Sequence, residues 1–317
     1  MRPHRIKAIG WAAMLLGLCG IAPAAEDTCR LTQYAELPVT YSPGGGLILP
    51  VTIVGRPASM LLVLTAGRGL IFRPLMGELG LKLSHTSSVF AIAGQTTNDY
   101  TVVPELRVGN VRYPDWDMLV WADAKRPAPQ LDAGDPVGWL GADLFRNYDI
   151  ELDLGHNRFR IFSHEHCPGK PPVYWSSQYN VVPMRRGPVK DVYFVMEVDG
   201  KKLETQLATG GGASAISTVV SKVAYGWDGA ADDADAHSSQ RTVSLTAPGL
   251  NVTNARVMLM KPPMQSCLPS LDRDGAYAID VCLGLYPLML GTEILKKLRI
   301  YMAVKEEKLY FTSWDAQ

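Results

Sequence analysis

The sequence predicts an all-β protein built from two similar lobes that follow one another along the chain. The 317 residues are 47 % hydrophobic, yet they include 29 glycines and 22 prolines. This composition is typical of turn-rich β structure with apolar cores rather than of disorder. A pattern of apolar strands, polar turns and strands that end in glycine also occurs twice, and such self-similarity indicates a repeated architecture.

Residues 1–25 have the features of a secretory signal peptide. Three basic residues among the first seven precede an apolar stretch at 9–21, which is too short to span a bilayer comfortably, and an Ala-x-Ala cleavage site follows at 22–24. An uncleaved N-terminal anchor is the alternative. We expect secretion across the inner membrane into the periplasm or the extracellular space, and no membrane span in the mature chain.

The charges give no reason to expect a nucleic-acid partner or an anionic membrane surface. The 31 Lys and Arg residues balance the 31 Asp and Glu residues, so the chain has no net field that would attract a polyanion.

A hairpin pattern opens each copy of the repeat. Apolar residues alternate over 48–64 around a turn at 55–57, and again over 193–207 around a turn at Asp199-Gly200. An Asp-Gly pair between such alternations is among the strongest short signals for a hairpin. Each second strand then runs into a loop of small residues, and a short helical pattern follows each loop.

Each copy closes with a strand that ends in glycine. Two apolar residues precede Gly141 in one copy and Gly291 in the other, and a short amphipathic turn and a hairpin follow each glycine, over 149–162 and 299–311. The two copies therefore define an N-terminal lobe at 26–167 and a C-terminal lobe at 173–317.

Two acids occupy equivalent places just after these glycines. Asp143 and Glu293 stand at the start of the short helices, where a carboxylate accepts backbone N–H bonds and complements the helix dipole. We interpret them as structural caps, together with the structural glycines Gly141 and Gly291.

Strands that run into Thr-Gly loops, each paired with a later apolar-apolar-Gly strand, resemble the core of the pepsin-like and retropepsin-like aspartic proteases. The resemblance extends over residues 45–312 and includes bacterial exported proteins with two tandem lobes. It implies two β-barrel lobes related by a pseudo-two-fold axis around a cleft. Ala93 and Gly94, within a hairpin pattern at 89–103, are then candidates for a flap over the cleft; an ordinary surface hairpin is the alternative.

Both aspartate positions that the resemblance implies are replaced, by Leu64 and Ala208. In such enzymes two neighbouring carboxylates share one proton and activate a water molecule, which hydrocarbon side chains cannot do. Loop residues that serve backbone geometry are retained: Thr65, Gly67, Thr209 and Gly210. The sequence therefore predicts a pseudoprotease.

We expect this pseudoprotease to bind a peptide, or an unfolded or extended protein segment, in the cleft between the lobes. A sheet-lined groove can hold an extended segment through main-chain hydrogen bonds without cleaving it. Two alternatives stay open: a hydrolase that uses non-standard residues in the same cleft, and a structural subunit whose cleft is closed. No cofactor is expected.

Four cysteines remain after the signal peptide, and an even number in an exported chain suggests disulfides. Three pairings are compatible with the sequence, and we favour the one that keeps each bond within a lobe: Cys29–Cys167 and Cys267–Cys282. No metal site is expected. The segment 164–166 holds two histidines but lacks a third and a fourth ligand, and Ser214 with His237 is a weak arrangement for a serine nucleophile.

Overall fold

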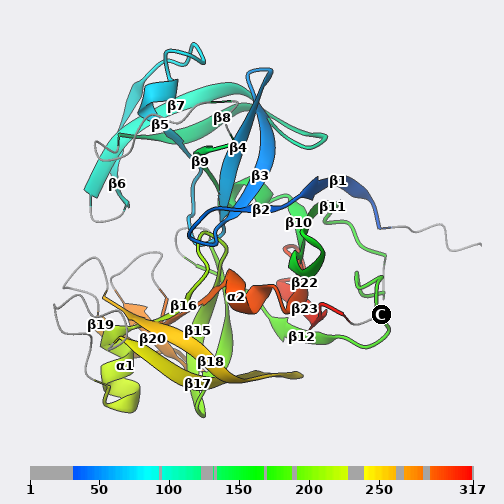
Figure 1. The fold of residues 1–317 in the computed structure, drawn as a ribbon, viewed down its shortest axis with the longest axis vertical. Helices are drawn as coiled ribbons and strands as arrows, with labels where there is room; N and C mark the ends of the chain where they lie inside the picture. The colour runs from blue at the N-terminus through cyan, green and yellow to red at the C-terminus, as the bar shows by residue number, and fades with distance from the viewer. Residues whose placement is uncertain are drawn as a thin grey trace, which may run out of the picture.

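The computed structural model of the protein describes residues 31–315, except for the segments 93–94, 123–130, 132–133, 168–169, 188–190, 228–238, 262–267 and 281–285. Strands dominate the described residues, and a lobe of strands lies at each end of the long axis (Figure 1). The predicted fold class, all-β with two tandem lobes and short helices, is confirmed. No helix in the described part of the chain has the length and apolar character needed to cross a membrane.

The N-terminal lobe is an eight-stranded sheet with the order β2-β3-β4-β9-β5-β8-β7-β6. Its first hairpin turns at Val54 and Gly55, whose φ angles of 50° and 77° are the left-handed values that a two-residue hairpin turn needs. The turn predicted at 55–57 therefore lies slightly earlier. The strands are β2 (Thr40–Tyr41), β3 (Leu47–Ile53), β4 (Arg56–Val63), β5 (Leu70–Phe72), β6 (Ser84–Ile92), β7 (Gln95–Val108), β8 (Val111–Trp121) and β9 (Pro136–Gly141).

The C-terminal lobe is a nine-stranded sheet with the order β13-β14-β17-β18-β16-β21-β15-β20-β19. Its first hairpin turns at the predicted pair Asp199 and Gly200, with φ angles of 45° and 78°. The strands are β13 (Arg185–Arg186), β14 (Val192–Val198), β15 (Lys201–Ala208), β16 (Ser214–Ser217), β17 (Gln240–Ala247), β18 (Leu250–Met260), β19 (Leu268–Leu271), β20 (Tyr277–Asp280) and β21 (Leu288–Gly291).

Short helices follow the same positions in both lobes. The helical patterns predicted after the two loops form η1 (Arg73–Leu75) and α1 (Thr218–Tyr225), and the patterns after the two glycines form η2 (Ala142–Phe145) and α2 (Thr292–Leu295). A further turn, η3 (Leu154–His156), lies within the hairpin that follows η2.

The two predicted hairpins at 149–162 and 299–311 form, but they do not stay within separate lobes. They build one six-stranded sheet with the order β1-β11-β10-β22-β23-β12, in which β10 pairs antiparallel with β22. The sheet lies on the side of the molecule opposite the free ends of β6 and β19 (Figure 1). Its strands are β1 (Gln33–Pro38), β10 (Tyr148–Asp153), β11 (Arg158–Ser163), β12 (Asn180–Pro183), β22 (Leu298–Ala303) and β23 (Lys308–Ser313).

This shared sheet joins the halves of the chain into one body. The edge of each hairpin forms hydrogen bonds with the other hairpin, through β10 and β22. This satisfies backbone N–H and C=O groups that would otherwise lack partners. One continuous cluster of buried apolar side chains accordingly extends from β1 to β23.

Candidate functional site

The loops that follow β4 and β15 meet where the two lobes join. The amide N–H of Leu64 donates a hydrogen bond to Thr209 Oγ1 over 3.0 Å, and the Thr209 side chain is fully buried. A Cβ atom on Gly210 would lie 3.3 Å from Val63 Cγ2, so the loops are also in van der Waals contact. Thr209, one of the predicted loop residues, therefore ties one loop to the other.

The glycine-ended strands fix the positions of both loops. In the parallel pair β4–β9, Val63 lies opposite Gly141, and in the pair β15–β21, Ala208 lies opposite Gly291. A Cβ atom at either glycine would collide with the backbone of the neighbouring loop. Only glycine lets the strand pass this close, which gives the repeated apolar-apolar-Gly pattern its physical reason.

Strand register shows which residues of the two loops correspond. Because Val63 and Ala208 face the two equivalent glycines, the counterpart of Ala208 is Val63, and the counterpart of Leu64 is Thr209. The two predicted aspartate positions, Leu64 and Ala208, are thus one residue apart in the repeat. The hairpin turns at 54–55 and 199–200 show the same offset.

Neither loop contains a carboxyl group under either correspondence. Residues 63–69 read VLTAGRG and residues 207–213 read LATGGGA. Leu64 is only 3 % exposed, so hydrocarbon occupies the junction. Thr65 and Gly67 are half-buried beside it. The loops can therefore hold backbone in place, but they cannot transfer a proton.

A third segment, which sequence reasoning missed, packs on the second loop. This segment is the turn at residues 42–46. Gly44 O accepts a hydrogen bond from Gly212 N–H over 2.8 Å, and Gly45 O accepts one from Thr292 Oγ1 over 2.7 Å. A Cβ atom on Gly45 would lie 2.7 Å from Gly212 Cα, and Gly45 has a φ of 80°. The triple glycine at 44–46 was the signal in the sequence that could have indicated this close approach.

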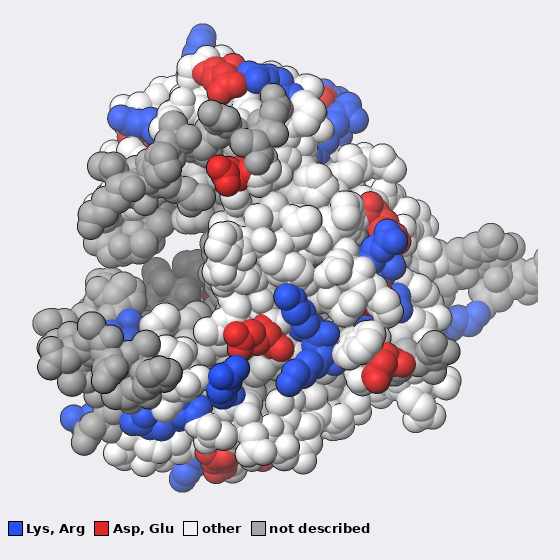
Figure 2. Space-filling model, in the orientation of Figure 1, with Lys and Arg blue, Asp and Glu red and all other residues white. Residues whose placement is uncertain are grey.

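The molecule is indented between the two lobes (Figure 2), and an edge strand lies on each side of the indentation. β6 is the last strand of the N-terminal sheet, and β19 is the last strand of the C-terminal sheet. Val89 on β6 is 67 % exposed, and Leu271 on β19 is 62 % exposed. The flap candidates Ala93 and Gly94 lie outside the described residues.

The acids predicted to cap the short helices differ in their surroundings. Glu293 is exposed, and its backbone N–H donates to Gly212 O over 3.1 Å. Asp143 is buried. Burial raises the pKa of Asp143 to about 6, although the nearby charges of Arg146 and Arg68, and hydrogen bonds from the backbone N–H groups of Asp143 and Gly69, act to lower it.

Among the cysteines, only Cys167 lies within the described residues, where it is not a free thiol. The predicted pairing of Cys29, Cys167, Cys267 and Cys282 stays a prediction. A separate groove of about 700 Å³ lies on the C-terminal lobe between β12, β14 and β17, and its lining contains none of the predicted site residues.

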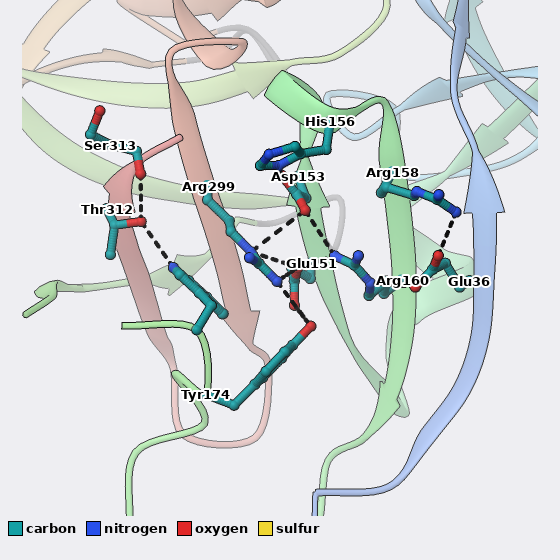
Figure 3. A network of polar contacts seen from close by, with 11 residues as sticks. Glu36, Glu151, Asp153, His156, Arg158, Arg160, Tyr174, Arg299, Thr312 and Ser313 are labelled. Carbon is teal, nitrogen blue, oxygen red and sulfur yellow. Dashed lines mark hydrogen bonds and ion pairs between the residues drawn. The ribbon is translucent and has the colours of Figure 1, made fainter. Parts of the chain in front are cut away.

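A buried ionic network lies at the centre of the shared sheet (Figure 3). Arg160 and Arg299 flank Glu151 and Asp153, with Arg160 Nη1 at 2.5 Å and Arg299 Nη2 at 2.9 Å from Glu151 Oε1. Tyr174 OH also donates to Glu151 Oε2 over 2.8 Å. The two acids are buried at the junction of the lobes, and each has an arginine partner. They are therefore not two neighbouring carboxyl groups without counter-charges.

His166, from the segment 164–166 with its two histidines, takes part in a second buried cluster. Its ring nitrogens contact Asp149 and, over 2.6 Å, Glu306, and Tyr301 OH donates to Asp149 over 3.2 Å. The cluster links β10 to the β22–β23 hairpin. No group of three or more side chains that could hold a metal ion occurs among the described residues.

The His166 cluster should make stability depend on pH. Burial favours the neutral ring, but the hydrogen bonds to Asp149 and Glu306 outweigh it and raise the pKa of His166 above 6.5. A raised pKa in the folded state adds stability that is fully present below about pH 6.5 and is lost as the pH rises through the folded-state pKa. We expect the free energy of unfolding of wild type, measured in urea, to exceed that of His166→Gln. The difference should be largest at pH 6 and smallest at pH 9. A constant difference across this range would contradict the assignment.

No family model and no curated protein matches the sequence. Among solved structures, the chain is similar to an aspartic proteinase from Irpex lacteus, with a TM-score of 0.49, 10 % identity, and coverage of 88 % of this chain and 97 % of that one. It is also similar to a retropepsin-like aspartic protease from Rickettsia conorii, with a TM-score of 0.32, 11 % identity, and coverage of 42 % and 96 %. These identities and TM-scores are too low to support any conclusion about the activity of this protein. The aspartic-protease-like fold rests on the paired loops, the glycine-ended strands and the shared sheet.

Proposed function

We propose that the protein binds an extended segment of a peptide or unfolded protein between its lobes without cleaving it. The observation that carries this proposal is the junction of the two loops, where neither pair of corresponding residues, Val63 with Ala208 or Leu64 with Thr209, contains an acid. The proposed setting is the periplasm or the extracellular space, after removal of residues 1–25.

The missing acids remove most of the rate enhancement that such a site could give. General acid or base assistance is worth roughly 10²–10⁴-fold for each group. Loss of both corresponds to about 5–11 kcal/mol of transition-state stabilisation. Binding without turnover is therefore the function that we propose.

The edge strands offer the means of binding. Among the described strands, β6 and β19 each have one unpaired edge, and an extended chain can add to such an edge through main-chain hydrogen bonds. The exposed side chains of Val89, Leu268 and Leu271 lie on these strands and provide apolar contacts for alternate side chains of the bound segment.

We expect Val89→Lys and Leu271→Lys each to weaken the binding of fluorescently labelled casein, an unfolded protein, by about tenfold or more. A lysine on an edge strand blocks the addition of a further strand. The matched control is Val181→Lys, on the edge strand β12 of the shared sheet, which should bind like wild type. Fluorescence anisotropy measures all three. Equal binding by all variants would place the peptide elsewhere.

The absence of catalysis is tested separately. The mature protein should release no acid-soluble fragments from casein between pH 3 and pH 8. Cleavage that pepstatin blocks would overturn the proposal, because it would require a working acid pair.

A further inference from the structure

The groove of about 700 Å³ on the C-terminal lobe lies where strand β14 changes its neighbour. On one side, β14 pairs with β15 along residues 194–198. On the other side, β13 pairs with residues 192–193 of β14, and β17 pairs with residues 197–198. Residues 194–196 lie between these two pairings and line the groove. The groove therefore opens over a gap in the ladder of strand pairs.

The backbone carbonyl of Val195 points toward this gap. In an antiparallel ladder, alternate residues of a strand direct their N–H and C=O groups to the same neighbour. Gly187 N–H donates to Asp191 O over 2.9 Å, and Asp199 N–H donates to Ser244 O over 3.0 Å. The odd-numbered residues along β14 therefore face β13 and β17, and Val195 is the odd-numbered residue within the gap.

Two prolines leave the Val195 carbonyl without a donor from either strand. The β13–β14 register, when extended, places Pro183 opposite Val195, and the β14–β17 register places Pro248 there. Neither proline has an N–H group to donate, and both line the groove. No N–H of a turn or loop in the described residues bonds Val195 O. Because an acceptor without a donor is costly, the gap favours a ligand that supplies an N–H.

The walls of the groove suit an uncharged and apolar ligand. The positive charges of Arg185 and Lys202 in the lining balance the negative charges of Glu197 and Asp274, and Arg185 forms an ion pair with Asp274. A charged ligand therefore gains no net attraction. Apart from the two prolines and Val195, the apolar lining residues are Val182, Phe194, Met196 and Ala247. The volume lies within the roughly 300–1,000 Å³ that is usual for ligand sites.

We propose that this groove holds a short, uncharged and extended peptide segment, one residue of which donates its backbone N–H to Val195 O. An extended segment presents an N–H to the same side at every second residue and directs apolar side chains to the walls. It thereby adds to the sheet at the gap, as a peptide does in strand addition. The site is separate from the proposed binding between the lobes and does not depend on it.

Isothermal titration calorimetry of the mature full-length chain tests the site with two probes. We expect the capped pentapeptide acetyl-Ala-Leu-Ala-Leu-Ala-amide to bind. Its analogue with every amide nitrogen methylated keeps the side chains but has no N–H donor, so it should bind at least about tenfold more weakly. No binding of the first peptide, or equal binding of both, would overturn the proposal.

A variant that fills the groove locates the binding. Ala247 is half-buried in the lining, so Ala247→Trp should weaken binding of the pentapeptide by about tenfold or more. The matched control is Val102→Trp, at an exposed position of β7 outside the groove, which should bind like wild type. Equal binding by the two variants would contradict the proposal. A wild-type dimer that Ala247→Trp converts to a monomer in sedimentation velocity would assign the groove to a second copy of the chain instead.

A second measurement uses the wild-type chain, and it decides if circular dichroism shows that Ala247→Trp is unfolded. The sequence contains two Val-Met pairs, at 195–196 and 257–258, so ¹³C-carbonyl valine combined with ¹⁵N-methionine gives one NMR signal for each valine carbonyl. The pentapeptide should move the Val195 carbonyl signal downfield through the new hydrogen bond and leave that of the buried Val257 in place. An unmoved Val195 signal would overturn the proposal. The casein variants at β6 and β19 are measured separately, so failure of one site is distinguishable from failure of the other.

Discussion

Replacing Leu64 by aspartate is expected to destabilise the protein by at least about 3 kcal/mol at pH 7. The Leu64 side chain is buried at the junction of the loops, where a carboxylate would lose its hydration, and the cation of the first loop, Arg68, is exposed. Urea unfolding measures the loss. Leu64→Ala isolates the cost of the lost packing, about 2–5 kcal/mol. The excess cost of aspartate over alanine should shrink at pH 4, where the acid can protonate.

The same substitution should not create a protease. Leu64 and Ala208 are not equivalent positions in the two lobes, so aspartates placed at both would not meet as a symmetric pair. Leu64→Asp combined with Ala208→Asp should therefore leave casein intact. Wild-type stability in Leu64→Asp, or cleavage by the double variant, would show that the junction is more open and more polar than its burial indicates.

Arg299→Met is expected to lower the free energy of unfolding by about 3–5 kcal/mol. The substitution leaves Arg160 as the single arginine that pairs with both Glu151 and Asp153. The side chains of Glu151 and Arg299 are 0 % and 12 % exposed, so water cannot replace the lost partner. Although burial opposes ionisation, hydrogen bonds from His156 and Arg160 lower the pKa of Asp153, and this acid therefore stays charged.

Arg158→Met is the matched control for this network. Arg158 pairs with Glu36 over 2.5 Å, but its side chain is 49 % exposed, and exposed ion pairs contribute about 0–1 kcal/mol. Urea unfolding at pH 7 compares the two variants. If both variants lost the same free energy of unfolding, Arg299 would contribute no more to stability than an exposed arginine does.

The sequence predicted the elements of the fold better than their assembly. The Asp199-Gly200 turn, the glycine-ended strands and the hairpins are local patterns, and each appears in the structure. The shared sheet is not local: nothing in the alternation of residues 149–154 says that Ile150 pairs with Met302. Periodicity specifies which face of a strand is buried, but it does not specify the partner strand.

The ionic network was missed for a related reason. Acids at alternate positions of β10 are the usual pattern of a solvated face, yet Glu151 and Asp153 are buried. Glu151 lies opposite Arg160 in its own hairpin, a pairing that the sequence could have indicated. Arg299 comes from the other half of the chain and could not be placed without the fold.

The loops show the limit of alignment by eye. The threonine that follows each position matched Leu64 with Ala208, whereas strand pairing matches Val63 with Ala208. Neither match places an acid in the loops.

The asymmetric distribution of charge across the β10–β22 pair has a consequence for how the halves of this chain can exist. Glu151 and Asp153 belong to the N-terminal half, and Arg299, one of their two counter-charges, belongs to the C-terminal half. Two copies of the N-terminal half could not substitute for the whole by pairing β10 with β10, because four acids would then face only the arginines of their own hairpins. Although the two halves have a similar order of strands and loops, they therefore carry complementary charges across the β10–β22 pair and are not interchangeable there.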